Sequence, residues 1–183
     1  MGLWARRLRI DPELRIVSGR RVFFSFHYEQ DIWRATNVRK SGEFDASARA
    51  GWDEASLWED AKRKGPDEIR RLIDAGLKGT SVTAVLIGTE TADRPWVNYE
   101  IDKSIERGNG MLGLRIHSLK DQDGNRSRRG RVPDGLLGNG YRIYEWNPRA
   151  LGRWVEHAAI DAGKPCIAHD RDKCVMCRWL WWW

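Results

Sequence analysis

The sequence predicts an α/β fold in which helices cover both faces of a parallel β-sheet. Two observations lead to this prediction. Strand-like and helix-like segments alternate along the chain, which is typical of parallel strands joined by crossover helices. The strand-like segments are also apolar over most of their length, as expected for strands that are buried on both faces.

The first part of the chain is expected to supply two strands and two helices. Residues 21–26 are rich in valine and phenylalanine and predict a buried strand, and residues 42–47 predict a shorter strand that ends at Asp45. A helix is expected between these strands. A second helix has Pro66 in its first turn and Gly79 as its stop. Its apolar face is formed by Ile69, Leu72, Ile73 and Leu77.

The centre of the chain gives the most convincing strand, at residues 81–88, where the sequence SVTAVLIG is almost continuously apolar. The helix that follows has Pro95 in its first turn, Asp93 as a candidate cap and Gly108 as its stop. One face of this helix carries apolar residues at a spacing of four, namely Val97, Ile101 and Ile105.

The last part of the domain is expected to hold a strand at residues 111–119, a long polar loop, a strand at residues 141–146 and a final helix. Asn147 is a plausible cap for that helix, and Pro148 suits its first position. In parallel sheets of this kind, ligands bind outside the carboxyl ends of the strands, where the strand order reverses.

The composition indicates a soluble globular protein. The 183 residues are 41% hydrophobic and 32% charged, and no apolar run approaches the roughly 18 residues needed to span a membrane. The first residues lack the apolar stretch of a secretory signal, and the three cysteines all fall near the C-terminal end, so we expect a reducing, cytoplasmic setting. The net charge of +6 is only weak support for a nucleic-acid partner, and none is expected.

We expect three segments: an N-terminal extension at residues 1–19, a main domain at residues 20–162, and a tail at residues 163–183 that is rich in cysteine and tryptophan. The tail has the residue types of a tetrahedral zinc site in Cys166, His169, Cys174 and Cys177. Their spacing fits no standard zinc motif, so no metal is assigned. The ending WLWWW leaves three interpretations open: packing on the domain, self-association, or no function.

The candidate site residues follow the predicted strands. Ser25, Phe26, His27 and Tyr28 come at the end of the first strand, and Asp45 ends the second. Glu100 lies about one turn into the helix after the third strand, four residues beyond Trp96. Taken alone, Glu100 is better explained as a carboxylate that interacts favourably with the helix dipole, and Trp96 is better explained as a packing residue.

Four segments in order resemble the TIR (Toll/interleukin-1 receptor) domain. They are RRVFFSFHY, EFDAS, the stretch from GPDEIRRL through VLIGTE, and the Trp-x-x-x-Glu element in RPWVNYE. Within TIR proteins, the amino-acid sequence of these segments is most similar to that of the TIR-like subunit of the bacterial Thoeris antiphage defence system. The resemblance covers roughly residues 20–146, and its strength lies in four motifs in the right order, since each motif alone is weak.

This resemblance implies a flavodoxin-like, five-stranded sheet in the order 2-1-3-4-5. It also implies an enzyme that cleaves NAD at the nicotinamide–ribose bond and forms a cyclic ADP-ribose-type signal, with NAD as substrate and no cofactor. The resemblance further implies that the diffusible product activates a partner effector protein, with a phage-derived molecule as a candidate trigger. A non-enzymatic TIR-like interaction module is the alternative.

The resemblance also assigns residues. Glu100 matches the family's catalytic glutamate, and Trp96 matches the tryptophan of the same motif. Ser25, Phe26, His27 and Tyr28 match the loop that lines the nucleotide pocket, and Asp45 matches the acidic end of strand two. Residues 57–65 occupy the position of the mobile loop after that strand.

The chemistry agrees with a single carboxylate. Cleavage of the nicotinamide–ribose bond develops positive charge on the ribose, as glycoside hydrolysis does, but the departing pyridine is already cationic and needs no proton. One carboxylate can then stabilise the charged sugar.

The basic run at residues 126–131 is either a phosphate-binding patch or a solvated loop, and the sequence favours the loop.

Overall fold

The computed structural model describes residues 19–41, 49–50 and 55–165. The predicted strand at residues 42–47 with Asp45, the zinc-like residues of the tail and nearly all of the N-terminal extension lie outside these ranges.

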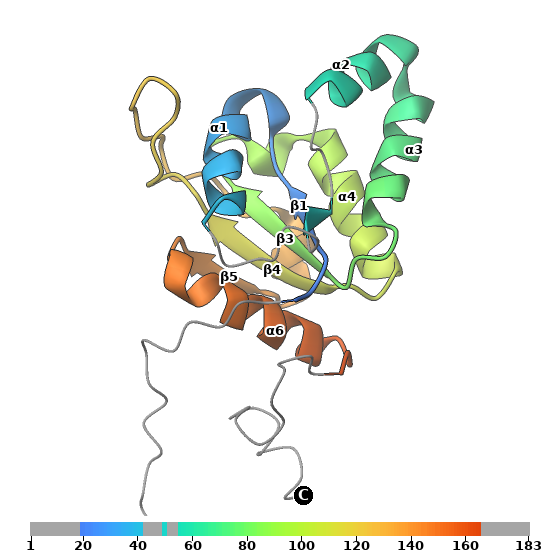
Figure 1. Ribbon diagram of the computed structural model, residues 1–183, viewed down its shortest axis with the longest axis vertical. Coiled ribbons are helices and arrows are strands. Elements are labelled where there is room, and N and C mark those ends of the chain that lie inside the picture. The colour runs from blue at the N-terminus through green and yellow to red at the C-terminus, as the bar shows by residue number, and fades with distance from the viewer. Residues whose placement is uncertain (1–18, 42–48, 51–54, 166–183) are drawn as a thin grey trace, which may run out of the picture.

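A five-stranded parallel sheet forms the centre of the molecule, in the order β2-β1-β3-β4-β5 (Figure 1). This is the order that the family resemblance implies. The strands are β1 (Val22–Ser25), β2 (Arg49–Ala50), β3 (Val82–Ile87), β4 (Gly110–Arg115) and β5 (Arg142–Glu145). The register pairs Ser25 at the end of β1 with Val85 in β3, and Ile87 at the end of β3 with Arg115 in β4.

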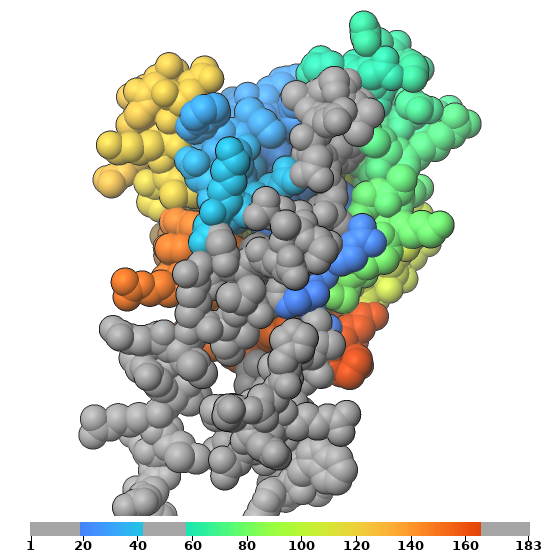
Figure 2. All heavy atoms as spheres, in the orientation of Figure 1, coloured from blue at the N-terminus to red at the C-terminus, as the bar shows by residue number. Residues whose placement is uncertain are grey.

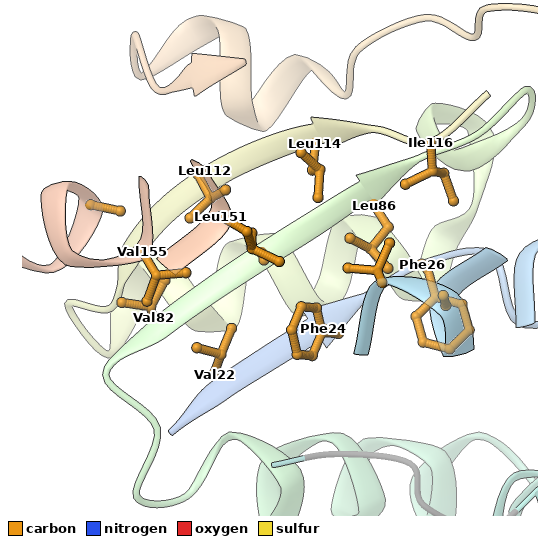
Figure 3. Packing of buried hydrophobic residues seen from close by; sticks show 14 of the residues in the cluster. Val22, Phe24, Phe26, Val82, Leu86, Leu112, Leu114, Ile116, Leu151 and Val155 are labelled. Carbon is orange, nitrogen blue, oxygen red and sulfur yellow. The ribbon is translucent and has the colours of Figure 1, made fainter. Parts of the chain in front are cut away.

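Helices cover both faces of this sheet, as predicted. Alternate residues along each strand face opposite sides, so Phe24 and Leu86 belong to one apolar cluster, whereas Phe23 and Val85 belong to clusters on the other side. The first face carries α1 (Tyr28–Arg39) and α6 (Leu151–Asp161), and Figure 3 shows Leu151 and Val155 of α6 among the strand side chains. The second face carries α2 (Ala55–Lys64), α3 (Pro66–Leu77), α4 (Pro95–Glu106) and the short α5 (Asp134–Gly138).

Several element boundaries differ from the prediction. Residues 57–65, expected as a loop, lie mostly in helix α2, and the predicted strand at residues 111–119 ends at Arg115. Helix α6 is preceded by a 3-10 turn, η3 (Pro148–Ala150), where the Asn147 side chain accepts a hydrogen bond from the backbone N–H of Arg149 at 3.0 Å. The cap prediction for Asn147 is confirmed, although the cap closes the 3-10 turn and not the α-helix itself.

The connection between β4 and β5 crosses the carboxyl end of β3. Gly130 lies so close to Gly88 that a side chain on Gly130 would collide with the backbone oxygen of Gly88. The buried Arg34 of α1 also binds this connection, through the backbone oxygens of Leu119 and Asn125 and the carboxylate of Asp121. Figure 2 shows the yellow connection standing beside the blue α1.

The fold places a crevice at the carboxyl ends of β1 and β3. These strands are neighbours, but the helices that follow them, α1 and α4, lie on opposite faces of the sheet. The strand order reverses here, and this is the position where open α/β sheets bind ligands. No helix in the described part of the chain is long and apolar enough to cross a membrane.

Candidate active site

A buried carboxyl group lies at this crevice. Glu100, in the second turn of α4, is only 3% exposed. The hydroxyl of Ser25, the last residue of β1, donates a 2.5 Å hydrogen bond to Oε2 of Glu100. The strand end and the helix therefore hold one carboxyl group between them.

Burial changes the ionisation of this carboxyl group. Loss of water around Glu100 raises its pKa to about 8, and the hydrogen bond from Ser25 opposes that rise. The group is mostly protonated at neutral pH when the site is empty. A cationic ligand beside it would favour the ionised form and lower the pKa. Such a strong perturbation in a crevice is typical of functional sites.

A buried chain of hydrogen bonds fixes the backbone of Glu100. The hydroxyl of Thr83, in β3, donates to the hydroxyl of Ser104 at 2.8 Å, and Ser104 donates to the backbone oxygen of Glu100 at 2.6 Å. The side-chain amide of Asn109 donates to Thr83 at 3.2 Å. Thr83 and Ser104 are fully buried, so this chain sets where α4 sits on the sheet. No sequence motif reveals it.

A pocket of about 160 Å³ opens next to Glu100. Four aromatic side chains line it: Phe26 and Tyr28 after β1, Trp96 of α4 and Trp58 of α2. The rings of Tyr28 and Trp58 lie 5.7 Å apart. The pocket lining is completed by His27, Glu29, Lys62, Arg94, Pro95 and Val97.

Of the two tryptophans that line the pocket, the sequence predicts Trp96 as a site residue but not Trp58. Trp96 was expected in the site, and it both lines the pocket and packs edge-on against Tyr99, with ring centroids 6.1 Å apart. The sequence assigns no role to Trp58, because residues 57–65 depart from the usual TIR sequence at the position of the mobile loop. Helix α2 brings Trp58 to the pocket and buries it, with 8% exposure.

The mouth of the pocket is charged. Lys62 forms an ion pair with Glu29 at 2.5 Å, and Arg94 pairs with Glu90. Burial, and then the nearby Arg94 cation, lower the pKa of His27, so its imidazole is neutral at neutral pH. Asp93 does not cap α4: the helix begins after Arg94, and Asp93 instead pairs with Arg131 at 2.9 Å.

The predicted site residues come together wherever the structure describes them. Phe26, His27, Tyr28, Trp96 and Glu100 all line the pocket, and Ser25 lies against Glu100. Asp45 lies outside the described residues. Among the described residues, no group of three or more His, Cys, Asp or Glu side chains is placed to hold a metal ion.

A larger hollow of about 440 Å³ lies at the opposite end of the sheet, where β4 and β5 begin. Glycines and asparagines form much of its lining, and its charged residues, Arg142 and Asp161, are exposed. It has no buried ionisable group comparable to Glu100. The chemistry is therefore expected at the smaller pocket.

The strand order, together with a buried glutamate four residues after a tryptophan at the edge of β1 and β3, defines a TIR-like domain. The family model described as "Thoeris protein ThsB, TIR-like domain" matches residues 23–121. A Bacillus cereus (strain MSX-D12) protein named "Putative cyclic ADP-D-ribose synthase ThsB1" is 45% identical over 148 residues, which cover 75% of this chain and 75% of the relative. The chain belongs to the Thoeris ThsB family of TIR-like proteins.

Proposed function

We propose that this protein cleaves NAD at the nicotinamide–ribose bond and closes the ADP-ribose part into a cyclic signalling nucleotide. The observation that carries the proposal is the buried Glu100, held by Ser25 beside an aromatic pocket at the reversal of strand order. The name of the Bacillus cereus relative, a cyclic ADP-D-ribose synthase, supports the same reaction.

Glu100 supplies the charge that the reaction needs. The pyridinium ring of NAD is cationic, and its approach lowers the pKa of Glu100 from about 8, so the carboxyl group releases its proton on binding. The carboxylate then accepts hydrogen bonds from ribose hydroxyls. As the bond to nicotinamide breaks, the positive charge moves to the ribose, and the buried carboxylate stabilises it.

The walls of the pocket favour cyclisation over hydrolysis. Phe26, Tyr28, Trp58 and Trp96 surround the place where the ribose would lie and leave little room for water. A pocket of about 160 Å³ suits a nicotinamide ring and its ribose better than a whole dinucleotide. The adenosine end then lies outside and can fold back, so that one of its own nucleophilic atoms attacks the ribose.

The signalling role extends this proposal. Membership of the Thoeris family supports a product that diffuses to a separate effector protein, with synthesis switched on during phage infection. NAD is the substrate in this scheme, and no resident cofactor is required. The protein is expected to act in the cytoplasm, where NAD is available.

The test is mass spectrometry of the small molecules formed from NAD. The full-length protein is incubated with NAD in buffer and in extract of phage-infected bacteria, beside the Glu100→Gln and Glu106→Gln variants. Glu106 is an exposed glutamate on the same helix, paired with Lys103 at 2.6 Å, and serves as the matched control. We expect nicotinamide and a cyclic product from the wild type and Glu106→Gln, and neither from Glu100→Gln.

Two results would count against the proposal. Full turnover by a folded Glu100→Gln variant would remove Glu100 from the chemistry. Absence of nicotinamide release in both buffer and infected extract would favour a non-enzymatic interaction module.

A further inference from the structure

Two helices begin at the pocket, and neither has a side-chain cap. Helix α1 starts after His27 and α4 starts after Arg94, and neither of these N-cap residues makes a side-chain capping hydrogen bond. Both residues line the pocket. The N-terminus of a helix carries free N–H groups and a partial positive charge, which together attract anions.

The same two residues carry buried nitrogen atoms without partners. His27 is only 7% exposed, yet its Nδ1 has no hydrogen-bond partner among the described residues. The Nε of Arg94 is likewise buried and without a partner in the described part of the chain. Buried polar atoms are nearly always satisfied, so these two nitrogens at one pocket are placed to bind a ligand with oxygen atoms.

Among the described residues that line the pocket, Arg94 is the cation whose carboxylate partner lies outside the lining. Glu29 and Lys62 neutralise each other, and Glu100 is mostly protonated while the site is empty. Arg94 is also paired, but its partner Glu90 is not part of the lining. An anion that enters the pocket therefore meets Arg94 and two helix N-termini, and among the described residues it competes with Glu90 for the guanidinium group.

The basic run at residues 126–131 is not a better candidate. Arg129 pairs with Glu145 at 2.8 Å, and Arg131 pairs with Asp93 and Asp134 at 2.9 and 2.8 Å. None of the residues in this run lines the pocket. Two of its four arginines, Arg129 and Arg131, are thus engaged with neighbouring acidic groups on the surface.

We propose that the N-termini of α1 and α4, with Arg94 as the charged ligand and His27 as a hydrogen-bonding partner, bind the diphosphate of the dinucleotide. Arg94 exchanges Glu90 for the diphosphate when the substrate enters. The arrangement fits the order of groups in NAD, because the diphosphate is joined to the same ribose whose other end reaches Glu100. This inference rests on the proposed function, since it names the part of NAD that this end of the pocket holds.

Calorimetric binding of ADP-ribose to the full-length protein tests this site without requiring any reaction. ADP-ribose carries the diphosphate, whereas nicotinamide riboside carries none. We expect Arg94→Gln to weaken ADP-ribose binding at least tenfold while changing nicotinamide riboside binding less than twofold. Glu90→Gln frees the guanidinium group and is expected to tighten ADP-ribose binding. Arg94→Lys, which keeps the charge but not the two-pronged geometry, should fall between wild type and Arg94→Gln.

The matched control is Arg70→Gln, which breaks another arginine–acid pair on the surface, with Asp67 at 2.7 Å, away from the pocket. The inference is overturned if ADP-ribose does not bind the wild type, if Arg94→Gln binds it as well as Arg70→Gln does, or if Arg94→Gln weakens nicotinamide riboside equally. A different result would show that the proposed function is wrong while the diphosphate site is real. In that case ADP-ribose binding depends on Arg94, but no nicotinamide is released from NAD.

Discussion

The hydroxyl of Ser25 donates a 2.5 Å hydrogen bond to Oε2 of Glu100, and both residues are buried. This bond joins the last residue of β1 to the second turn of α4, on the opposite face of the sheet from α1. It is also the contact that lowers the pKa of Glu100 against the effect of burial. The position and the charge of the carboxyl group thus depend in part on this hydroxyl.

Ser25→Ala is expected to shift the pH dependence of nicotinamide release toward alkaline pH. For the wild type, kcat/KM should rise with pH and level off above about 8, because the free enzyme must lose the Glu100 proton. Without the Ser25 hydroxyl the pKa of Glu100 rises further, so activity at pH 7 falls on the order of tenfold or more and recovers in part at higher pH. Ser81→Ala, at the other end of the sheet, is the control and should keep the wild-type profile. A uniform loss at every pH would contradict this role.

Glu100→Gln is expected to stabilise the folded protein at alkaline pH. Burial raises the folded-state pKa of Glu100 to about 8, above the ordinary value of 4.5, so the folded state holds this proton more tightly than the unfolded state. The resulting stability is fully present below pH 4.5 and is lost as pH rises through about 8, at ~1.4 kcal/mol per pKa unit of difference. A glutamine carries no such dependence.

The measurement is urea unfolding of both proteins between pH 5 and pH 9. The free energy of unfolding of Glu100→Gln should exceed that of the wild type at pH 9, and the difference should shrink toward pH 5. A constant difference across this range would show that Glu100 does not titrate as burial implies. Glu106→Gln, on the exposed side of α4, should show little pH-dependent change.

Thr83→Val tests the hydrogen-bond chain beneath Glu100. The valine keeps the shape of the threonine but removes the bond to Ser104, at a cost of about 1–2 kcal/mol in the free energy of unfolding. Because the chain positions Glu100 and does not touch the substrate, we expect kcat to fall several-fold with KM for NAD nearly unchanged. Thr36→Val is the control, since Thr36 makes a similar bond to Ile32 within α1 at 2.8 Å. A rise in KM at constant kcat would argue against a positioning role.

Trp58→Leu tests the aromatic wall that α2 contributes. A leucine keeps the site apolar but opens the wall beside Tyr28, so water gains access to the charged ribose. The ratio of cyclic to linear ADP-ribose, measured by mass spectrometry, is expected to fall while nicotinamide release continues. Trp33→Leu serves as the control, because Trp33 is half-exposed on α1 and does not line the pocket. An unchanged product ratio would mean that Trp58 does not exclude water.

The strands and helices around the sheet can be predicted from the sequence because the residues that determine each element lie within or next to that element. The apolar run of β3 and the proline and glycine that bound α4 each determine their own segment, and Gly108 does adopt the left-handed conformation, with φ of 68°. The order of the strands follows from the family resemblance. Glu100 was identified for the same reason, as part of an ordered set of motifs.

The rest of the site depends on relationships that no single segment contains. Arg94, and not Asp93, became the N-cap because Asp93 finds a partner in Arg131, thirty-eight residues away. Trp58 reaches the pocket only because residues expected as a loop form α2. The bond between Thr83 and Ser104 depends on how α4 sits on β3, and hydrophobic periodicity does not specify that alignment.

The contact between Ser25 and Glu100 spans 75 positions of the chain. A polypeptide still emerging from the ribosome cannot form it until α4 has been synthesised and has docked on the sheet. Under the proposed function, incomplete or unfolded copies cannot degrade the cell's NAD, because the catalytic centre exists only in the finished domain.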